Sequence, residues 1–170
     1  MNEEDIYVET KYFLKSLDWI PIAGDPPRGT DIPRLEIKKP GEVQSLTKNK
    51  DSIINDLVFC KNGYLSLIEN KPSYRHEDVT KLRRAFQKPE WRESIVTALE
   101  KRGIDKKYSS NIDIDGIKSG EKIVKVVAYQ GIPQKNLSDF VQIGWLKNNE
   151  KPEIRVGTDL KELENLFELN

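Results

Sequence analysis

The chain has 170 residues, no net charge at neutral pH and a hydrophobic content of 36%, a composition that suits one soluble globular domain. No apolar run reaches the length of a membrane span, and no basic and apolar leader opens the sequence. The single cysteine excludes an internal disulfide, and one His with one Cys cannot build a structural zinc site. We therefore expect a cytoplasmic protein without a membrane partner.

Apolar periodicity predicts an α/β domain with a mixed sheet. We treat residues 1–170 as a single domain, with a core at 1–130 and a C-terminal extension at 131–170. The predicted elements, in chain order, are a helix at 2–17, strands at 34–38, 53–60 and 64–71, helices at 76–88 and 90–102, a loop at 104–120, a strand at 122–129, a short helix or turn at 136–142, a strand at 153–156 and a helix that Thr158 caps.

A tight turn between the second and third predicted strands organises the chemistry. Asn62-Gly63 is a strong hairpin signal, because both residues tolerate the positive φ angles of a type I′ turn. A two-residue loop fixes the register so that Asp56 faces Glu69, and residues directly opposite each other share one face of the sheet. Two carboxylates side by side repel each other unless a cation lies between them.

Mg²⁺ would relieve this repulsion. It prefers oxygen ligands, and one or two carboxylates often hold it together with water and a substrate phosphate; we expect Mn²⁺ to substitute for it. Lys71 lies two residues beyond Glu69 and therefore projects from the same face of the strand. Its ammonium could orient or help to deprotonate a water molecule and offset the charge that develops on a phosphate. The pattern predicts metal-dependent hydrolysis of a phosphodiester.

The stretch from Asp56 to Lys71 resembles the motif of the PD-(D/E)XK nuclease superfamily: an Asp, a hairpin, then an acid-x-Lys at the end of an apolar strand. The sequence around the Asn-Gly turn is most similar to that of the nuclease domain of type I restriction motor subunits. Asn55 stands where the family name has Pro. The resemblance implies a restriction endonuclease-like core (helix, three strands, helix, strand) with a C-terminal helix, metal ligation by Asp56 and Glu69, and action of Lys71 on the attacking water.

Glu9 is the predicted third acid of this centre. Many relatives in the superfamily carry a glutamate on the helix before the hairpin, where it binds the metal directly or through water. Glu9 lies between Ile6 and Phe13 on the expected apolar stripe, where a carboxylate is costly unless it is paired or hydrated. Alternatively, Glu9 reaches solvent from the edge of the stripe. Glu3 and Glu4 instead suit the positive end of the helix dipole.

A second acid-x-Lys, Glu36-Ile37-Lys38, lacks a partner Asp at hairpin distance. We interpret it as a chance repeat of the motif or as the strand that precedes the hairpin.

Basic residues concentrate in the segment 71–107, which holds 11 Lys or Arg against 6 Asp or Glu. Within it, Arg75, Lys81, Arg84 and Lys88 are the predicted contacts to nucleic acid, since cations on the face of a helix opposite its apolar side can bind phosphates. An ordinary solvated surface would have the same pattern.

These features predict an endonuclease that hydrolyses DNA with Mg²⁺ and resembles a restriction enzyme. A junction resolvase, a transposon-end nuclease or an RNA-cleaving enzyme of the same superfamily are alternatives, as are a silent nucleic-acid-binding or assembly module of this fold and a small interaction domain with a chance motif. No phosphate-binding loop of a motor is present. Cutting both strands would require a homodimer, a larger restriction or recombination assembly, or two events. The closing helix is a candidate dimer contact, or else it covers the sheet.

Overall fold

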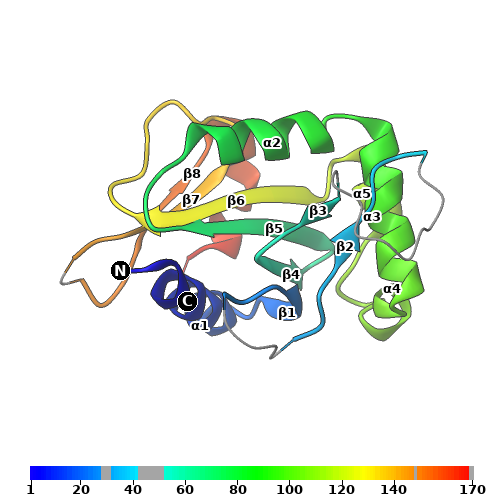
Figure 1. Ribbon diagram of the computed structural model, residues 1–170, viewed down its shortest axis with the longest axis horizontal. Helices are drawn as coiled ribbons and strands as arrows, with labels where there is room; N and C mark the ends of the chain where they lie inside the picture. Colours follow the sequence, from blue (N-terminus) through cyan, green and yellow to red (C-terminus); the bar gives the residue numbers. More distant parts are fainter. Residues whose placement is uncertain (28–31, 42–51, 148, 169–170) are drawn as a thin grey trace.

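The computed structural model describes residues 1–27, 32–41, 52–147 and 149–168. Its elements, shown in Figure 1, are α1 (Glu3–Ser16), β1 (Ile20–Gly24), β2 (Glu36–Ile37), β3 (Ile53–Ile54), β4 (Leu57–Lys61), β5 (Tyr64–Lys71), α2 (His76–Phe86), α3 (Pro89–Lys101), α4 (Ile104–Lys107), α5 (Ile114–Ser119), β6 (Ile123–Gln130), β7 (Val141–Trp145), β8 (Glu153–Val156) and the 3₁₀ helix η1 (Thr158–Leu166).

A six-stranded mixed sheet forms the centre of the molecule, in the order β1-β4-β5-β6-β7-β8. β5, β6 and β7 are parallel to one another, while β1, β4 and β8 pair antiparallel with their neighbours. β2 and β3 form a separate two-stranded sheet. The predicted α/β class with a mixed sheet is therefore confirmed. Among the helices of the described segments, none has the length and apolar content that crossing a membrane requires.

The two faces of the sheet pack against different helices, α2 on one side and α1 on the other (Figure 1). Successive residues of β5 point to opposite faces, as strand geometry requires. Leu67 belongs to the apolar cluster that includes Leu82 of α2. Ile68 belongs to the opposite cluster, which includes Ile6 of α1 and Leu163 of η1. The closing helix therefore covers the sheet, the second of the two alternatives above.

The hairpin of β4 and β5 has the predicted turn and register. Asn62 has a φ of 51° and Gly63 a φ of 87°, the positive values that a type I′ turn needs. Val58 pairs with Leu67, as a two-residue loop requires. β5 and β6 lie close to the predicted ranges, and β6 is a central strand as expected.

The predicted strand at 53–60 is wrong in one respect, because it is two strands rather than one. Ile53–Ile54 belong to the small sheet, and the main strand begins only at Leu57. The chain passes from one sheet to the other through Asn55 and Asp56. This break determines where the Asp56 carboxylate points.

Several other elements differ from the prediction. The main sheet begins with β1, a strand that the sequence did not predict, whereas the predicted strand at 34–38 contributes only the short β2 to the other sheet. The predicted loop at 104–120 contains α4 and α5. The predicted helix or turn at 136–142 is a turn that leads into β7, and η1 has Gly157 rather than Thr158 at its N-cap.

Candidate active site

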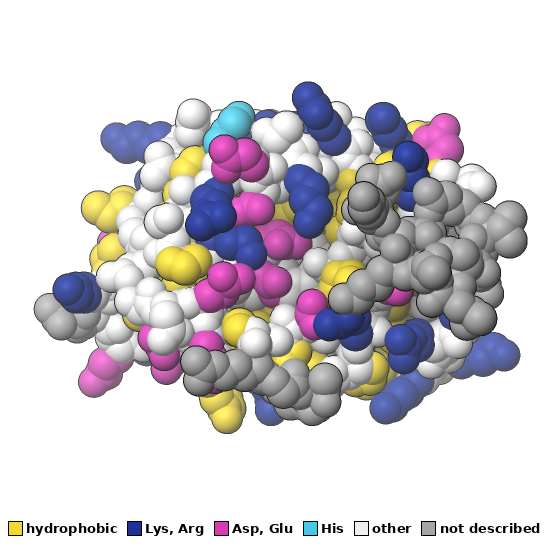
Figure 2. Space-filling view, viewed as in Figure 1, with side chains coloured by type: hydrophobic (Ala, Val, Ile, Leu, Met, Phe, Trp, Pro, Cys, Tyr) yellow, Lys and Arg dark blue, Asp and Glu magenta, His cyan; other side chains and the backbone are white. Residues whose placement is uncertain are grey.

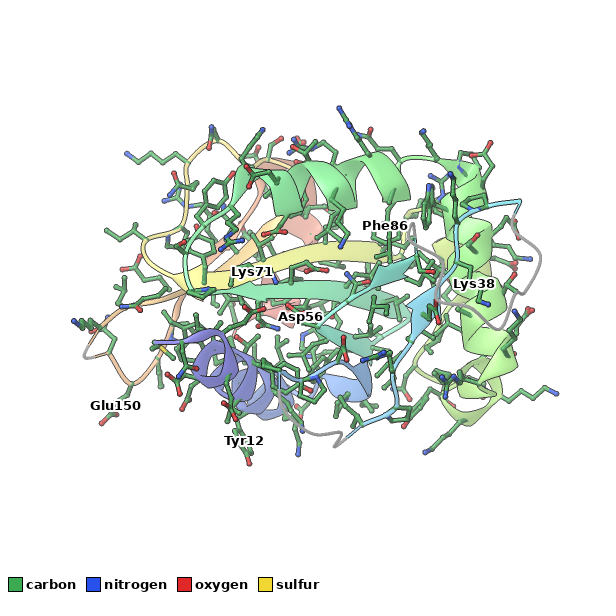
Figure 3. All side chains as sticks on the ribbon, in the orientation of Figure 1. Tyr12, Lys38, Asp56, Lys71, Phe86 and Glu150 are labelled. Carbon is green, nitrogen blue, oxygen red and sulfur yellow. The ribbon has the colours of Figure 1, made fainter. Side chains whose placement is uncertain are left out.

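Three of the four predicted catalytic residues, Asp56, Glu69 and Lys71, meet at the carboxyl end of β5, between α1 and α2. Figure 3 shows Asp56 and Lys71 close together there. Asp56 directly precedes β4, whereas Glu69 and Lys71 are the third-last and last residues of β5. The carboxyl ends of parallel strands, here β5 and β6, are common positions for sites in α/β sheets.

Asp56 is fixed by hydrogen bonds rather than by a strand rung. The last paired rung of the hairpin is Leu57 with Ile68, so the expected pairing of Asp56 with Glu69 lies one step beyond the ladder. There the Asp56 Oδ2 accepts the backbone N–H of Asn70 at 2.6 Å. Burial raises the pKa of Asp56, while the Asn70 N–H and the Lys71 ammonium oppose that rise.

Glu69 is a buried carboxylate, with only 4% of its surface exposed. Its Oε1 accepts a hydrogen bond from Asn55 Nδ2 at 2.9 Å. Burial, followed by the nearby charge of Asp56, raises the pKa of Glu69 to about 7. Near neutral pH this group is therefore poised between its protonated and charged forms, and a cation would favour the charged one.

Lys71 connects the acids of the site. Its Nζ lies 3.0 Å from Glu3 Oε1, 3.7 Å from Asp56 Oδ2 and 4.0 Å from Glu69 Oε2. Burial by itself would lower the pKa of Lys71, but the charges of Asp56, Glu3 and Glu69 outweigh it, and the pKa is raised. Lys71 is thus an ammonium in this state, suited to holding a water molecule or a phosphate oxygen.

The helix acid at this patch is Glu3 and not the predicted Glu9. Glu9 is exposed and lines an open hollow beside Phe13 and Trp145. The prediction placed Glu9 on the buried side of the helix, but the buried side of α1 contains Tyr7 and Thr10. Glu3 lies one turn before Tyr7 on that same side. A stripe drawn at positions 3, 7 and 10 would have identified Glu3.

Asn55 is a second residue whose role the sequence did not predict. Its side chain is 2% exposed, and its Oδ1 has no hydrogen-bond partner among the described residues. Asn55 and Asp56 occupy the break between β3 and β4. Asn55 orients the carboxylate of Glu69, and Asp56 is itself the second acid of the site. The only sign of this role in the sequence is that Asn55 is a polar residue between the apolar pairs Ile53-Ile54 and Leu57-Val58.

Asp56 and Glu69 are the two carboxylates of this patch that could hold a divalent cation. Glu3, Asp56 and Glu69 place three carboxylates around one ammonium, and burial and repulsion raise the pKa values of Asp56 and Glu69. Within the described part of the chain, no group of three or more His, Cys, Asp or Glu is arranged to hold a metal ion. A cation here would therefore have two carboxylate ligands, Asp56 and Glu69, and would depend on water and phosphate oxygens for the others, as Mg²⁺ commonly does.

The predicted nucleic-acid contacts lie around this patch. Arg75 is exposed and borders a narrow crevice together with Glu69 and Lys71. The positive charge of Lys81 lowers the pKa values of both Asp56 and Glu69, although burial raises them more. Figure 2 shows basic and acidic side chains gathered in the middle of this face. Three exposed cations line one hollow: Lys81 and Arg84 of α2, and Lys88 at the start of α3.

Among the described residues, the second acid-x-Lys has different surroundings. Glu36 lies in the two-stranded sheet, where it pairs with Ile54, and its Oε1 accepts a hydrogen bond from the Ser52 hydroxyl at 2.8 Å.

Comparisons of the sequence and the structure with known proteins identify no relative with which this site could be compared. No family model matches the chain, and neither the curated proteins nor the solved structures contain a significant match.

Proposed function

We propose that this protein is a metal-dependent nuclease with a core of the PD-(D/E)XK type, and that it hydrolyses phosphodiester bonds in DNA. One observation carries the proposal: a buried acid, Glu69, and a second acid, Asp56, each have an oxygen within 4.0 Å of the Lys71 ammonium. Two like charges side by side in a largely buried place are costly, and cation binding would offset that cost.

Asp56 and Glu69 would hold the metal ion, which when bound supplies a Lewis acid and lowers the pKa of water. The Asn70 N–H and the Asn55 amide fix these two carboxylates in place. Such supporting hydrogen bonds restrict the rotamers of ligating side chains and thereby maintain the geometry of the site.

Lys71 has the second role. Its ammonium, anchored by Glu3, is placed to orient the attacking water and to stabilise the negative charge that develops on the phosphate oxygens. Because its pKa is raised, Lys71 acts in this proposal as a proton-bearing cation rather than as the initial base.

DNA is the proposed substrate because cations surround the acidic centre. Arg75 and Lys81 flank the two carboxylates, and contacts of Lys and Arg with phosphates provide affinity that does not depend on sequence. RNA offers the same phosphates and is therefore included in the test.

The test is incubation of the purified protein with supercoiled plasmid, single-stranded DNA and RNA, each with Mg²⁺, Mn²⁺ or EDTA. We expect cleavage with the metals and none with EDTA. Asp56→Asn should abolish the cleavage, while Glu36→Gln, which alters the other acid-x-Lys, should not.

Failure of every metal to support cleavage of any of the three substrates would overturn the nuclease assignment. Binding without cleavage would favour the silent module of the same fold. Cleavage of RNA alone would retain the chemistry and change the substrate.

A further inference from the structure

A hollow beside the catalytic patch combines cations with an aromatic ring. It has a volume of about 450 Å³, within the range of roughly 300–1,000 Å³ that ligand sites occupy. Lys81, Arg84 and Lys88 line it together with Trp91. Among the described residues that border the hollow, none is acidic.

The hollow begins next to the acids of the proposed active centre. Lys81 lines it, and the charge of this same lysine influences both Asp56 and Glu69. Arg84 lies one helical turn further along α2, and Lys88 follows at the junction with α3. The cations therefore extend away from the catalytic patch in one direction, as contacts along a phosphate backbone would.

Trp91 is the unusual residue of this surface. Of the three tryptophans in the chain, Trp19 and Trp145 are 2% and 4% exposed and donate their indole N–H groups to protein oxygens. Trp91 is half-buried: it packs against the core and also borders the hollow. A tryptophan set among cations, in a hollow whose described lining contains no acid, is the combination that binds an unpaired base by stacking and its phosphates by charge.

The position of Trp91 is fixed by the junction of α2 and α3. The backbone N–H of Trp91 donates to the backbone oxygen of Lys88 at 3.1 Å, which closes the first turn of α3. The guanidinium of Arg92 donates to Phe86 O at 3.1 Å and to Gln87 O at 2.9 Å. These bonds hold the end of α2 against the start of α3, so Lys88 and Trp91 remain close together without a ligand to order them.

We propose that this hollow binds an unpaired segment of the nucleic acid, with a base on Trp91 and phosphates on Lys81, Arg84 and Lys88. The inference rests on the proposed function and specifies the form of its substrate: single-stranded nucleic acid, or a duplex with an unpaired stretch next to the scissile bond. A paired duplex covers the face of every base except at its two ends, so it offers Trp91 far fewer free base faces than a single strand does.

The test uses the intrinsic fluorescence of the protein in EDTA, excited where tryptophan alone absorbs. Because the other two tryptophans are buried, quenching by a bound oligonucleotide reports on Trp91. We expect a short oligothymidylate to quench the emission in a saturable titration and a blunt duplex of equal length to leave it nearly unchanged. Quenching by the duplex alone, or by neither, would overturn the inference.

Variants separate stacking from charge. Trp91→Ala should weaken oligothymidylate binding at least about five-fold, the lower end of the effect of removing a stacking side chain, while Trp91→Phe should retain most of the affinity. Lys81→Ala and Arg84→Ala should each reduce the steepness of the salt dependence by about one phosphate contact. Lys106→Ala, an exposed lysine of α4, is the matched control and should change neither quantity.

Equal binding by the wild type and by a folded Trp91→Ala would overturn the stacking contact. The outcome is independent of catalysis, since no metal is present. A protein that cleaves DNA without this quenching keeps the proposed function and loses the inference. A protein that binds single strands through Trp91 and never cleaves loses the nuclease assignment and keeps the binding surface.

Discussion

The chain contains two Glu-x-Lys segments, and their surroundings differ completely. Glu69 is buried at the end of a central strand, with Asp56 and Lys71 beside it. Glu36 lies in a two-stranded sheet with a serine hydroxyl as its partner. The same residue types at the same spacing thus form a largely buried cluster of two acids and a lysine in one place and a half-buried acid bound to a hydroxyl in the other. The difference shows that the chemistry depends on burial and a second acid rather than on spacing.

Replacing the lysine of each segment tests this contrast most directly. Lys71→Ala should reduce the cleavage rate by about 10²–10³-fold, the loss expected when one group that stabilises developing charge is removed. Lys38→Ala should leave the rate within about three-fold of wild type. The measurement is the initial rate of plasmid nicking with Mn²⁺, and equal losses in the two variants would contradict the assignment of Lys71.

The glutamates differ in their effect on stability. The pKa of Glu69 is about 7 in the folded protein, above its ordinary value of 4.5. The stability that follows from this shift is present below pH 4.5 and is lost as the pH rises through 7. Without metal, Glu69→Gln should therefore exceed the wild type in free energy of unfolding by about 2–3 kcal/mol at pH 8, and this gain should disappear near pH 4.5.

Glu36→Gln should give no comparable gain, because Glu36 is only half-buried, whereas Glu69 is 4% exposed. Denaturant unfolding in EDTA at pH 4.5 and 8 measures both variants. Addition of Mn²⁺ at pH 8 should stabilise the wild type and leave Glu69→Gln unchanged. An unfolding free energy of wild type that does not change between these pH values would contradict the raised pKa.

The hydrogen-bond partners of the two glutamates provide a third comparison. Asn55→Ala removes the amide that donates to Glu69 and should weaken Mn²⁺ binding about ten-fold, as loss of a supporting bond to a metal ligand typically does. Ser52→Ala removes the hydroxyl that donates to Glu36 and should have no effect on Mn²⁺. Calorimetric titration distinguishes the two, and equal affinities would remove Asn55 from the site.

The smallest expected effect on cleavage comes from Glu3, the acid of α1 beside Lys71. Glu3→Gln keeps an oxygen near Lys71 but removes the negative charge, so we expect cleavage to fall by only about three-fold. Glu9→Gln is the control on the same helix and should behave as wild type. A larger loss in Glu9→Gln than in Glu3→Gln would restore the original sequence-based assignment.

The sequence predicted the elements whose signals are local. The Asn62-Gly63 turn, the apolar runs of β5 and β6, and the amphipathic α2 and α3 each contain their own pattern. Three of the predicted site residues, Asp56, Glu69 and Lys71, follow from that turn and are brought together by it. Helix periodicity likewise placed Lys81 and Arg84 on the exposed side of α2, where the structure has them.

The missed features depend on distant contacts. β1 contains Pro21 next to an irregularity in its pairing, features that weaken the pattern of a strand but suit the edge of a sheet. β7 contains Gly144, where a side chain would collide with the backbone of Gly131. The choice between Glu3 and Glu9 depended on which side of α1 faces the sheet. The two strands could not be inferred from residues close by in sequence, and the helix acid required the correct stripe at positions 3, 7 and 10.

The Asn62-Gly63 turn lies at the far end of the hairpin from Asp56 and Lys71, yet its length decides whether they meet. Inserting one residue there would shift the pairing of β4 and β5 by one position, and side chains that share a face would point to opposite faces. Two small residues remote from any chemistry are therefore as indispensable to the arrangement as the charged groups themselves. Loop length, not only residue identity, should be preserved wherever this site is transplanted into another scaffold.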